Sequence, residues 1–194
     1  MLELETPVGL ARARLEPADS PRAGLVLGHG AGGGIDSPDL AGAAGAALET
    51  GLTVALVEQP YRVAGRRSPA PASQLDEAWI SVISQLPLDG LPLLVGGRSA
   101  GARVACRTAA DVGAKAVLCL AFPLHPPGKP EKSRLAELDA VEVPTLVVQG
   151  ERDPFGLPPP GPNRTVVTVP GTHSLQSSGT VAAAVAEWLP TVLG

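Results

Sequence analysis

Ser99 lies between two glycines in the stretch "VGGRSAGARV", with Gly97 two residues before it and Gly101 two residues after it. This spacing is typical of a sharp strand-to-helix turn that exposes a serine hydroxyl as a nucleophile. The chain contains 23 glycines, so the same pattern also arises by chance in a flexible turn. The motif therefore needs support from residues elsewhere in the chain.

A histidine and an acid that could serve Ser99 follow it in the sequence. Asp153 stands in "GERDPFG" and His173 in "PGTHSLQ". A serine hydroxyl is a weak nucleophile at neutral pH, so a neutral imidazole must take its proton, while a carboxylate behind the ring fixes the tautomer. We assign these roles to His173 and Asp153. Glu151 is the nearest rival acid.

Six apolar runs are the strands expected to position these residues. They are continuous rather than alternating, which is typical of strands buried on both faces of a parallel sheet. The runs are 24–29, 53–59, 92–97, 115–122, 144–150 and 164–170.

Helical segments are expected between the strands, at 38–50, 73–86, 100–112 and 177–192. The first has Ser37 as its expected N-cap and Pro38 at its first position. This alternation predicts one α/β domain over residues 1–194, with helices on both faces of the sheet. Residues 1–16 are expected to add an edge hairpin, and "LPPPGP" an extended connection.

The carboxyl ends of parallel strands meet at one edge of a sheet, where ligands usually bind. Ser99, Asp153 and His173 each follow one of the expected strands. We therefore expect the three side chains to converge, in the chain order Ser, acid, His.

Backbone amides are the expected donors to the oxyanion that forms during attack on a carbonyl. Ala100, at the start of a helix, is the first candidate. Ala31, in the glycine-rich stretch "GHGAGGG", is the second, with Gly30 beside it. We expect His29 to support this loop rather than to take part in catalysis.

The same glycines allow a dinucleotide-binding interpretation. Residues 28–33 fit Gly-x-Gly-x-x-Gly, and Glu58 ends the next strand, where an acid would bind a ribose. The spacing disfavours this alternative, because such a loop leads straight into its helix, whereas the expected cap here is Ser37.

Composition excludes several classes of function. Lys and Arg total 15 against 19 acids and form no basic run, which disfavours a nucleic-acid partner. No signal peptide or membrane-spanning run is recognisable, so we expect a cytoplasmic location. Cys106 and Cys119 are expected to be buried thiols, and no metal or cofactor is expected. The oligomeric state is left open.

Residues near the mouth of the site could line a pocket. The candidates are Gly30 in the glycine-rich stretch, Tyr61 after the second long strand and His125 after the strand 115–122. Residues 123–142 are too few and too rich in proline and charge to build a cap domain, and only 3% of residues are aromatic. We expect an open pocket that suits short acyl groups.

The stretches "VGGRSAGARVAC", "AFPLHPPGKPEK", "PTLVVQGERDPFG" and "GTHSL" resemble the α/β-hydrolase superfamily. Within it they resemble a family of small dienelactone-hydrolase-like proteins, which includes a testis-expressed protein and the hydrolase-like domain of a chromatin acetyltransferase-complex scaffold. The resemblance implies the α/β-hydrolase fold and a triad of Ser99, Asp153 and His173. "FGLPPPGPNR" departs from it, since such hydrolases place a helix there.

Two functions are consistent with these residues and their spacing. The first is a serine hydrolase that cleaves a small ester or thioester through an acyl-enzyme. The second is a non-catalytic interaction module that retains the fold.

Overall fold

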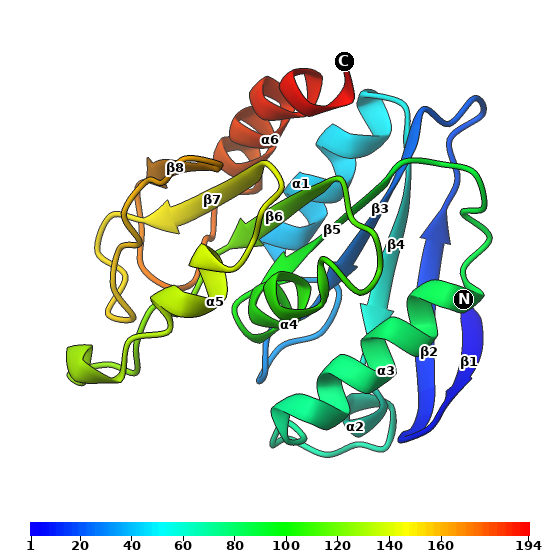
Figure 1. The fold of residues 1–194 in the computed structure, drawn as a ribbon, viewed down its shortest axis with the longest axis horizontal. Helices are drawn as coiled ribbons and strands as arrows, with labels where there is room; N and C mark the ends of the chain where they lie inside the picture. Colours follow the sequence, from blue (N-terminus) through cyan, green and yellow to red (C-terminus); the bar gives the residue numbers. More distant parts are fainter.

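The computed structural model describes residues 1–194 and contains one eight-stranded sheet. The strands lie in the order β1-β2-β4-β3-β5-β6-β7-β8, and β3 to β8 run parallel to one another. Their bounds are β1 Leu2–Thr6, β2 Gly9–Glu16, β3 Ala23–Gly28, β4 Leu52–Glu58, β5 Leu93–Arg98, β6 Ala116–Leu120, β7 Thr145–Gly150 and β8 Arg164–Val169. The expected parallel sheet is therefore confirmed (Figure 1).

The expected edge hairpin is also present. β1 and β2 pair antiparallel to each other, and β2 joins the sheet antiparallel to β4. The hairpin thus extends the sheet beyond β4, at the edge opposite to β8.

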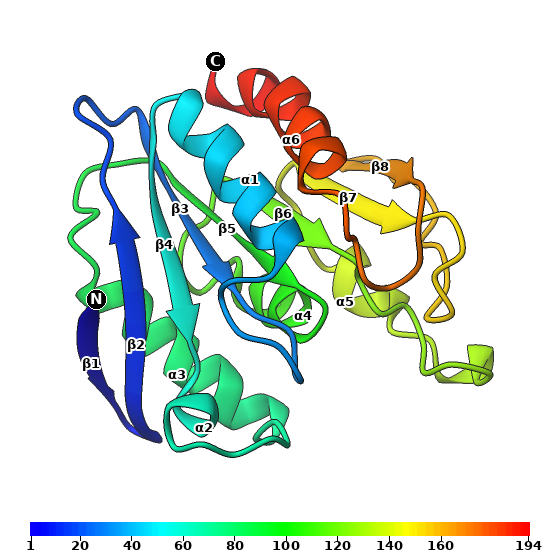
Figure 2. The ribbon, with the colours of Figure 1, turned by 180° about the vertical axis from the view of Figure 1, so that it is seen from behind.

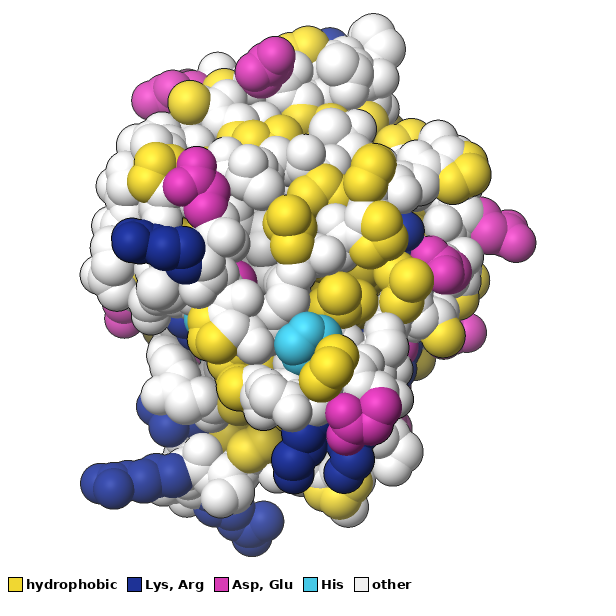
Figure 3. Space-filling model, turned by 90° about the vertical axis from the view of Figure 1, so that its left-hand side faces the viewer, with side chains coloured by type: hydrophobic (Ala, Val, Ile, Leu, Met, Phe, Trp, Pro, Cys, Tyr) yellow, Lys and Arg dark blue, Asp and Glu magenta, His cyan; other side chains and the backbone are white.

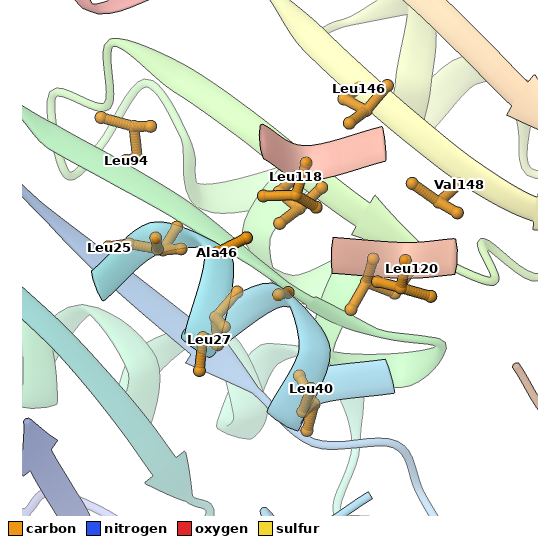
Figure 4. Packing of buried hydrophobic residues seen from close by; sticks show 14 of the residues in the cluster. Leu25, Leu27, Leu40, Ala46, Leu94, Leu118, Leu120, Leu146 and Val148 are labelled. Atoms are coloured by element: carbon orange, nitrogen blue, oxygen red, sulfur yellow. The ribbon is translucent and has the colours of Figure 1, made fainter. Parts of the chain in front are cut away.

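The continuous apolar runs from β3 to β7 form strands that are covered on both faces. The expectation is wrong for the run 164–170, because β8 lies at the sheet edge and Thr165 and Thr168 are exposed. Every residue of β3, β6 and β7 is buried. Alternate residues of these strands point to one face, where they pack together beneath α1; Figure 4 labels Leu25, Leu27, Leu118, Leu120, Leu146 and Val148 among them. The residues between them point to the opposite face and form a second core.

The helices divide between these two faces. α1 (Pro38–Glu49) and α6 (Ser178–Leu193) lie side by side over the first core, as Figure 2 shows. α3 (Ala72–Gln85) and α4 (Ala100–Thr108) cover the second core, in front of the sheet in Figure 1. The chain therefore has the three-layer α/β architecture expected from its sequence.

Several details differ from the expectation. α4 ends at Thr108 and not at residue 112, because turns follow from 109 to 113. Ser37 occupies the N-cap of α1, but its side chain makes no capping hydrogen bond. Two short helices, α2 (Pro60–Val63) and α5 (Leu135–Asp139), were not expected, since four or five residues carry too little periodicity to reveal a helix.

The connections near the carboxyl edge are short. Residues 151–163 contain no helix, in agreement with the departure seen in "FGLPPPGPNR". Between β6 and β7 there are only one 3₁₀ turn (Pro130–Lys132) and α5, and the 123–134 segment projects away from the sheet (Figure 1). The fold has no cap domain. No helix has both the length and the apolar character needed to cross a membrane.

Candidate active site

Ser99 occupies a strained turn between β5 and α4. Its backbone has a φ of 51° and a ψ of −106°, a conformation that non-glycine residues rarely adopt. The amide of Ser99 donates to the carbonyl of Leu120 on β6, with an N···O distance of 2.9 Å. The turn therefore presents the serine side chain at the carboxyl edge of the sheet.

The two glycines around Ser99 are required by close backbone approach. A Cβ atom at Gly97 or Gly101 would overlap the carbonyl oxygen of Gly28 at the end of β3. Gly97 also has a φ of +159°. The Gly-x-Ser-x-Gly spacing is thus explained by the packing of the turn against β3, and a flexible turn would not need it.

Ser99, His173 and Asp153 form one chain of hydrogen bonds. The Ser99 hydroxyl lies 2.9 Å from Nε2 of His173, and Nδ1 of His173 lies 2.8 Å from Oδ2 of Asp153. The carboxylate of Asp153 is completely buried, whereas 17% of the His173 side chain is exposed. In this arrangement the Ser99 hydroxyl can donate to the imidazole, and the imidazole can donate to the carboxylate.

Asp153 accepts two further hydrogen bonds. The amide of Phe155 donates to Oδ1 at 2.8 Å, and the side-chain amide of Gln149 donates to Oδ2 at 2.8 Å. Sequence reasoning missed Gln149. The available signal was a carboxamide inside the otherwise apolar run "PTLVVQG". Glu151, the rival acid, is exposed and makes no hydrogen bond or ion pair with His173, whose Nδ1 pairs with Asp153.

Phe155 covers the imidazole of His173. The two ring centroids lie 4.1 Å apart and the rings are inclined by 31°. Since its amide also binds Asp153, Phe155 contacts both partners of Ser99. Sequence reasoning did not single it out.

The glycine-rich loop approaches Ser99 from β3. A Cβ at Gly30 would lie 3.6 Å from the Cβ of Ser99, so this loop borders the nucleophile. The amide of Ala31 has no acceptor within the protein, and the amide of Ala100 is the first of α4, where no acceptor exists inside the helix. Neither N–H group is therefore committed to a hydrogen bond within the protein.

His29 and Tyr61 hold this loop in place. His29 accepts a hydrogen bond at Nε2 from the amide of Gln59 at 3.1 Å, so its Nδ1–H donates to the carbonyl of Gly30 at 2.8 Å. The Tyr61 hydroxyl donates to the carbonyl of Ala31 at 3.1 Å. Burial lowers the pKa of His29, which favours the neutral ring that this pair of hydrogen bonds requires.

Arg98 connects three segments around the site. Its Nε donates to the buried carboxylate of Asp39 on α1 at 2.8 Å, and its Nη2 donates to the carbonyl of His173 at 3.3 Å. A Cβ at Gly30 would lie 2.7 Å from Nη1 of Arg98, so the loop packs directly against the guanidinium.

Tyr61 and His125, two of the candidate pocket residues, make no side-chain hydrogen bond with Ser99, His173 or Asp153, although the His125 amide donates to the carbonyl of Phe155 at 3.0 Å. Tyr61 is only 6% exposed and contacts the loop, as described above. His125 lies beside Gly156, with its Nδ1 2.9 Å from the carbonyl of Pro126.

The two cysteines are thiols, as expected. Cys106 and Cys119 are free and buried, with 3.5 Å between their sulfur atoms.

Figure 3 looks onto the side of the molecule that carries β7, β8 and the 123–134 segment. Hydrophobic side chains surround a histidine near the centre of this face, and Lys and Arg side chains project at its lower end.

A cavity behind Ala100 and Gly101 measures only about 10 Å³, room for one water molecule. Four larger cavities, of up to about 710 Å³, are lined by residues other than Ser99, Asp153 and His173.

The glycine-rich loop does not have the geometry of a dinucleotide site. α1 begins at Pro38, so residues 34–37 separate the last glycine of the 28–33 pattern from the helix. A pyrophosphate bound at these glycines would not lie on the helix N-terminus. The fold also lacks any cluster of three or more His, Cys, Asp or Glu side chains that could hold a metal ion.

Comparisons with known proteins agree with this fold. The model of the family described as "Alpha/beta hydrolase domain" matches residues 21–161. An α/β serine hydrolase homologue from Coxiella burnetii superimposes with a TM-score of 0.79 at 16% identity, covering 97% of this chain and 96% of that one.

Two further solved structures are similar over nearly the whole chain. A lidless α/β serine hydrolase from Xanthomonas campestris has a TM-score of 0.72 and 22% identity, with 97% and 94% of the two chains covered. A dienelactone hydrolase from Anabaena variabilis has a TM-score of 0.77 and 17% identity, with 100% and 97% covered. At these identities the likeness establishes the fold.

Proposed function

Because the chain belongs to the alpha/beta hydrolase domain family, we propose that it is a serine hydrolase that cleaves a small ester or thioester through an acyl-enzyme on Ser99. The observation that carries this proposal is the hydrogen-bonded chain from Ser99 through His173 to Asp153, built on a strained turn. In the proposal, residues 1–194 act as one cytoplasmic domain without a metal or cofactor.

Each residue has a defined role in the proposed reaction. His173 takes the hydroxyl proton as Ser99 attacks the carbonyl carbon, and it returns that proton to the departing alcohol or thiol. Water then attacks the acyl-enzyme with His173 again as base, which releases the acid and restores the serine. Asp153 keeps the Nδ1–H of His173 oriented throughout.

The oxyanion of each tetrahedral intermediate would bind the amides of Ala31 and Ala100. Both groups lack an acceptor of their own, and Ala100 lies at the positive end of α4. Preorganised donors of this kind stabilise developing charge without reorganisation, because His29 and Tyr61 already fix the loop.

The substrate class follows from the open surroundings of Ser99. The fold has no cap domain, and the cavity behind Ala100 is too small for an alkyl chain. Short acyl groups therefore fit best. The narrower assignment, to the dienelactone-hydrolase-like family with its testis-expressed and acetyltransferase-scaffold members, rests on the four sequence stretches quoted above.

Labelling with a fluorophosphonate probe tests this proposal directly. We expect the probe to modify Ser99, located by peptide mass spectrometry, in wild type but not in Ser99→Ala, and only weakly in His173→Ala. Ser84→Ala, on the exposed side of α3, serves as the matched control and should label normally. Folded wild-type protein that stays unlabelled at several pH values would refute the proposal and favour the non-catalytic module.

A further inference from the structure

Two side chains form hydrogen bonds with the carboxylate of Asp153. One is the imidazole of His173, and the other is the carboxamide of Gln149. Gln149 is the fifth residue of β7 and is completely buried. Its Nε2 lies 2.8 Å from Oδ2 of Asp153, the same oxygen that accepts from His173. A buried amide thus lies against the acid of the candidate triad.

The nitrogen and the oxygen of this carboxamide differ in their hydrogen-bond partners. Its nitrogen lies within hydrogen-bonding distance of three acceptors, the carbonyls of Phe122 at 3.0 Å and Gly156 at 2.9 Å and the Asp153 carboxylate. Its oxygen is buried and has no partner. A flipped amide would set its oxygen against three other oxygens, so the orientation is fixed.

An unpartnered buried oxygen is costly, and an apolar side chain of the same size would avoid that cost. What only the glutamine supplies here is its NH₂ group. We therefore infer that Gln149 is a positioning residue, which holds Asp153 so that Oδ2 faces Nδ1 of His173 and thereby selects the Nδ1–H tautomer of the imidazole.

The other contacts of Gln149 extend this role. Phe122 follows β6, and Gly156 belongs to the turn that carries Asp153 and Phe155. One NH₂ group thus links the end of β6, the acid and the turn that follows it. Without it, Asp153 keeps the amide of Phe155 as a donor to Oδ1 but loses the donor that, with His173, fixes Oδ2.

This inference rests on the proposed function for its kinetic consequence, but the tautomer of His173 can be measured without any activity. Long-range ¹⁵N–¹H correlation spectra of the free protein report which ring nitrogen of each histidine carries the proton. In wild type we expect His173 to be protonated at Nδ1 when neutral. In Gln149→Met, which keeps the length of the side chain and removes the donor, we expect a mixture of the Nδ1–H and Nε2–H forms.

The kinetic measurement uses the same variant. With a short p-nitrophenyl ester we expect kcat to fall about 10- to 100-fold, by analogy with the loss of hydrogen-bonding partners that orient metal-ligating histidines. KM should stay within about threefold, because Gln149 is completely buried and contacts Asp153 rather than Ser99. A loss of packing alone would leave the tautomer unchanged.

Thr145→Val is the matched control, since Thr145 lies on the same strand, is also buried and donates a single hydrogen bond to the carbonyl of Val143. It should leave both the tautomer and kcat unchanged.

If Gln149→Met does not fold, Gln149→Asn can replace it. Asparagine keeps a polar group but is one methylene too short to reach Asp153, so the same outcomes apply. A purely Nδ1–H ring in the folded variant overturns the inference, whether or not the protein proves to be a hydrolase.

Discussion

Phe155 packs its ring on the imidazole of His173, with 4.1 Å between the ring centroids, while its amide donates to the carboxylate of Asp153. One residue therefore limits the movement of both the candidate base and its acid. The ring also covers one side of an imidazole that is otherwise partly open to water.

We expect Phe155→Ala to lower kcat/KM about 2- to 12-fold, the equivalent of the 0.5–1.5 kcal/mol that aromatic pairs contribute beyond their buried area. Phe155→Leu keeps apolar cover and the backbone donor, so it should lose less. Steady-state rates with p-nitrophenyl acetate measure both variants. An alanine variant as fast as wild type would show that the stacking has no catalytic consequence.

Gly101 tests the close packing of the nucleophile turn against β3. A Cβ there would overlap backbone atoms of Gly28, which no side-chain rotation can relieve. We expect Gly101→Ala to lower the free energy of unfolding by about 3 kcal/mol, the upper part of the range for overpacking.

Gly45→Ala is the control for Gly101→Ala, because no atom lies within 4 Å of the added Cβ in the middle of α1. It should raise the stability by about 0.5–1 kcal/mol. Urea titrations compare both variants with wild type. Equal stability of Gly101→Ala and wild type would contradict the close packing of the turn.

His29 makes the stability of the fold depend on pH. Burial lowers its pKa, so in the pH range just below the ordinary value of about 6.5 the unfolded chain takes up a proton that the folded protein does not. Above about pH 6.5, His29 therefore leaves the free energy of unfolding independent of pH. Below it, the free energy of unfolding falls by at most about 1.4 kcal/mol per pH unit until the pH reaches the lowered pKa of the folded protein.

We expect His29→Gln, which cannot titrate, to show a smaller loss of stability between neutral pH and about pH 5 than wild type. Urea unfolding at both pH values gives the two differences, and His125→Gln controls for a partly exposed histidine. Identical pH dependence in wild type and His29→Gln would mean that the buried ring does not contribute.

Acyl-chain length tests the open site. Without a cap domain there is no enclosed chamber for a long alkyl chain, so p-nitrophenyl esters of about two to six carbons should give the highest kcat/KM. No activation is expected at a lipid interface. A kcat/KM that keeps rising to about twelve carbons would require the 123–134 segment to fold over Ser99.

The sequence predicts the large features of the fold because they depend on hydrophobic periodicity. The strands β3 to β8 are apolar runs, and three of them are buried at every residue. Since loops after parallel strands share one edge, the meeting of Ser99, Asp153 and His173 also follows from the pattern.

The supporting contacts could not be predicted in this way. Gln149 belongs to a strand whose other residues are mostly apolar, and its partners come from the end of β6 and from the turn after β7. The pair of Arg98 and Asp39 joins residues far apart in the sequence. Such contacts depend on side-chain direction and strand register, which composition and spacing do not specify.

The order of the strands along the chain also determines when the site can assemble during biosynthesis. Ser99 follows β5 in the middle of the sheet, whereas Asp153 and His173 follow β7 and β8, which add to one edge. Translation runs from the N-terminus, so a ribosome-bound chain carries the serine before its partners exist. In the proposed enzyme, a nascent chain would therefore hold an ordinary alcohol at position 99, and reactivity towards cellular esters would arise only once the β8 edge had docked.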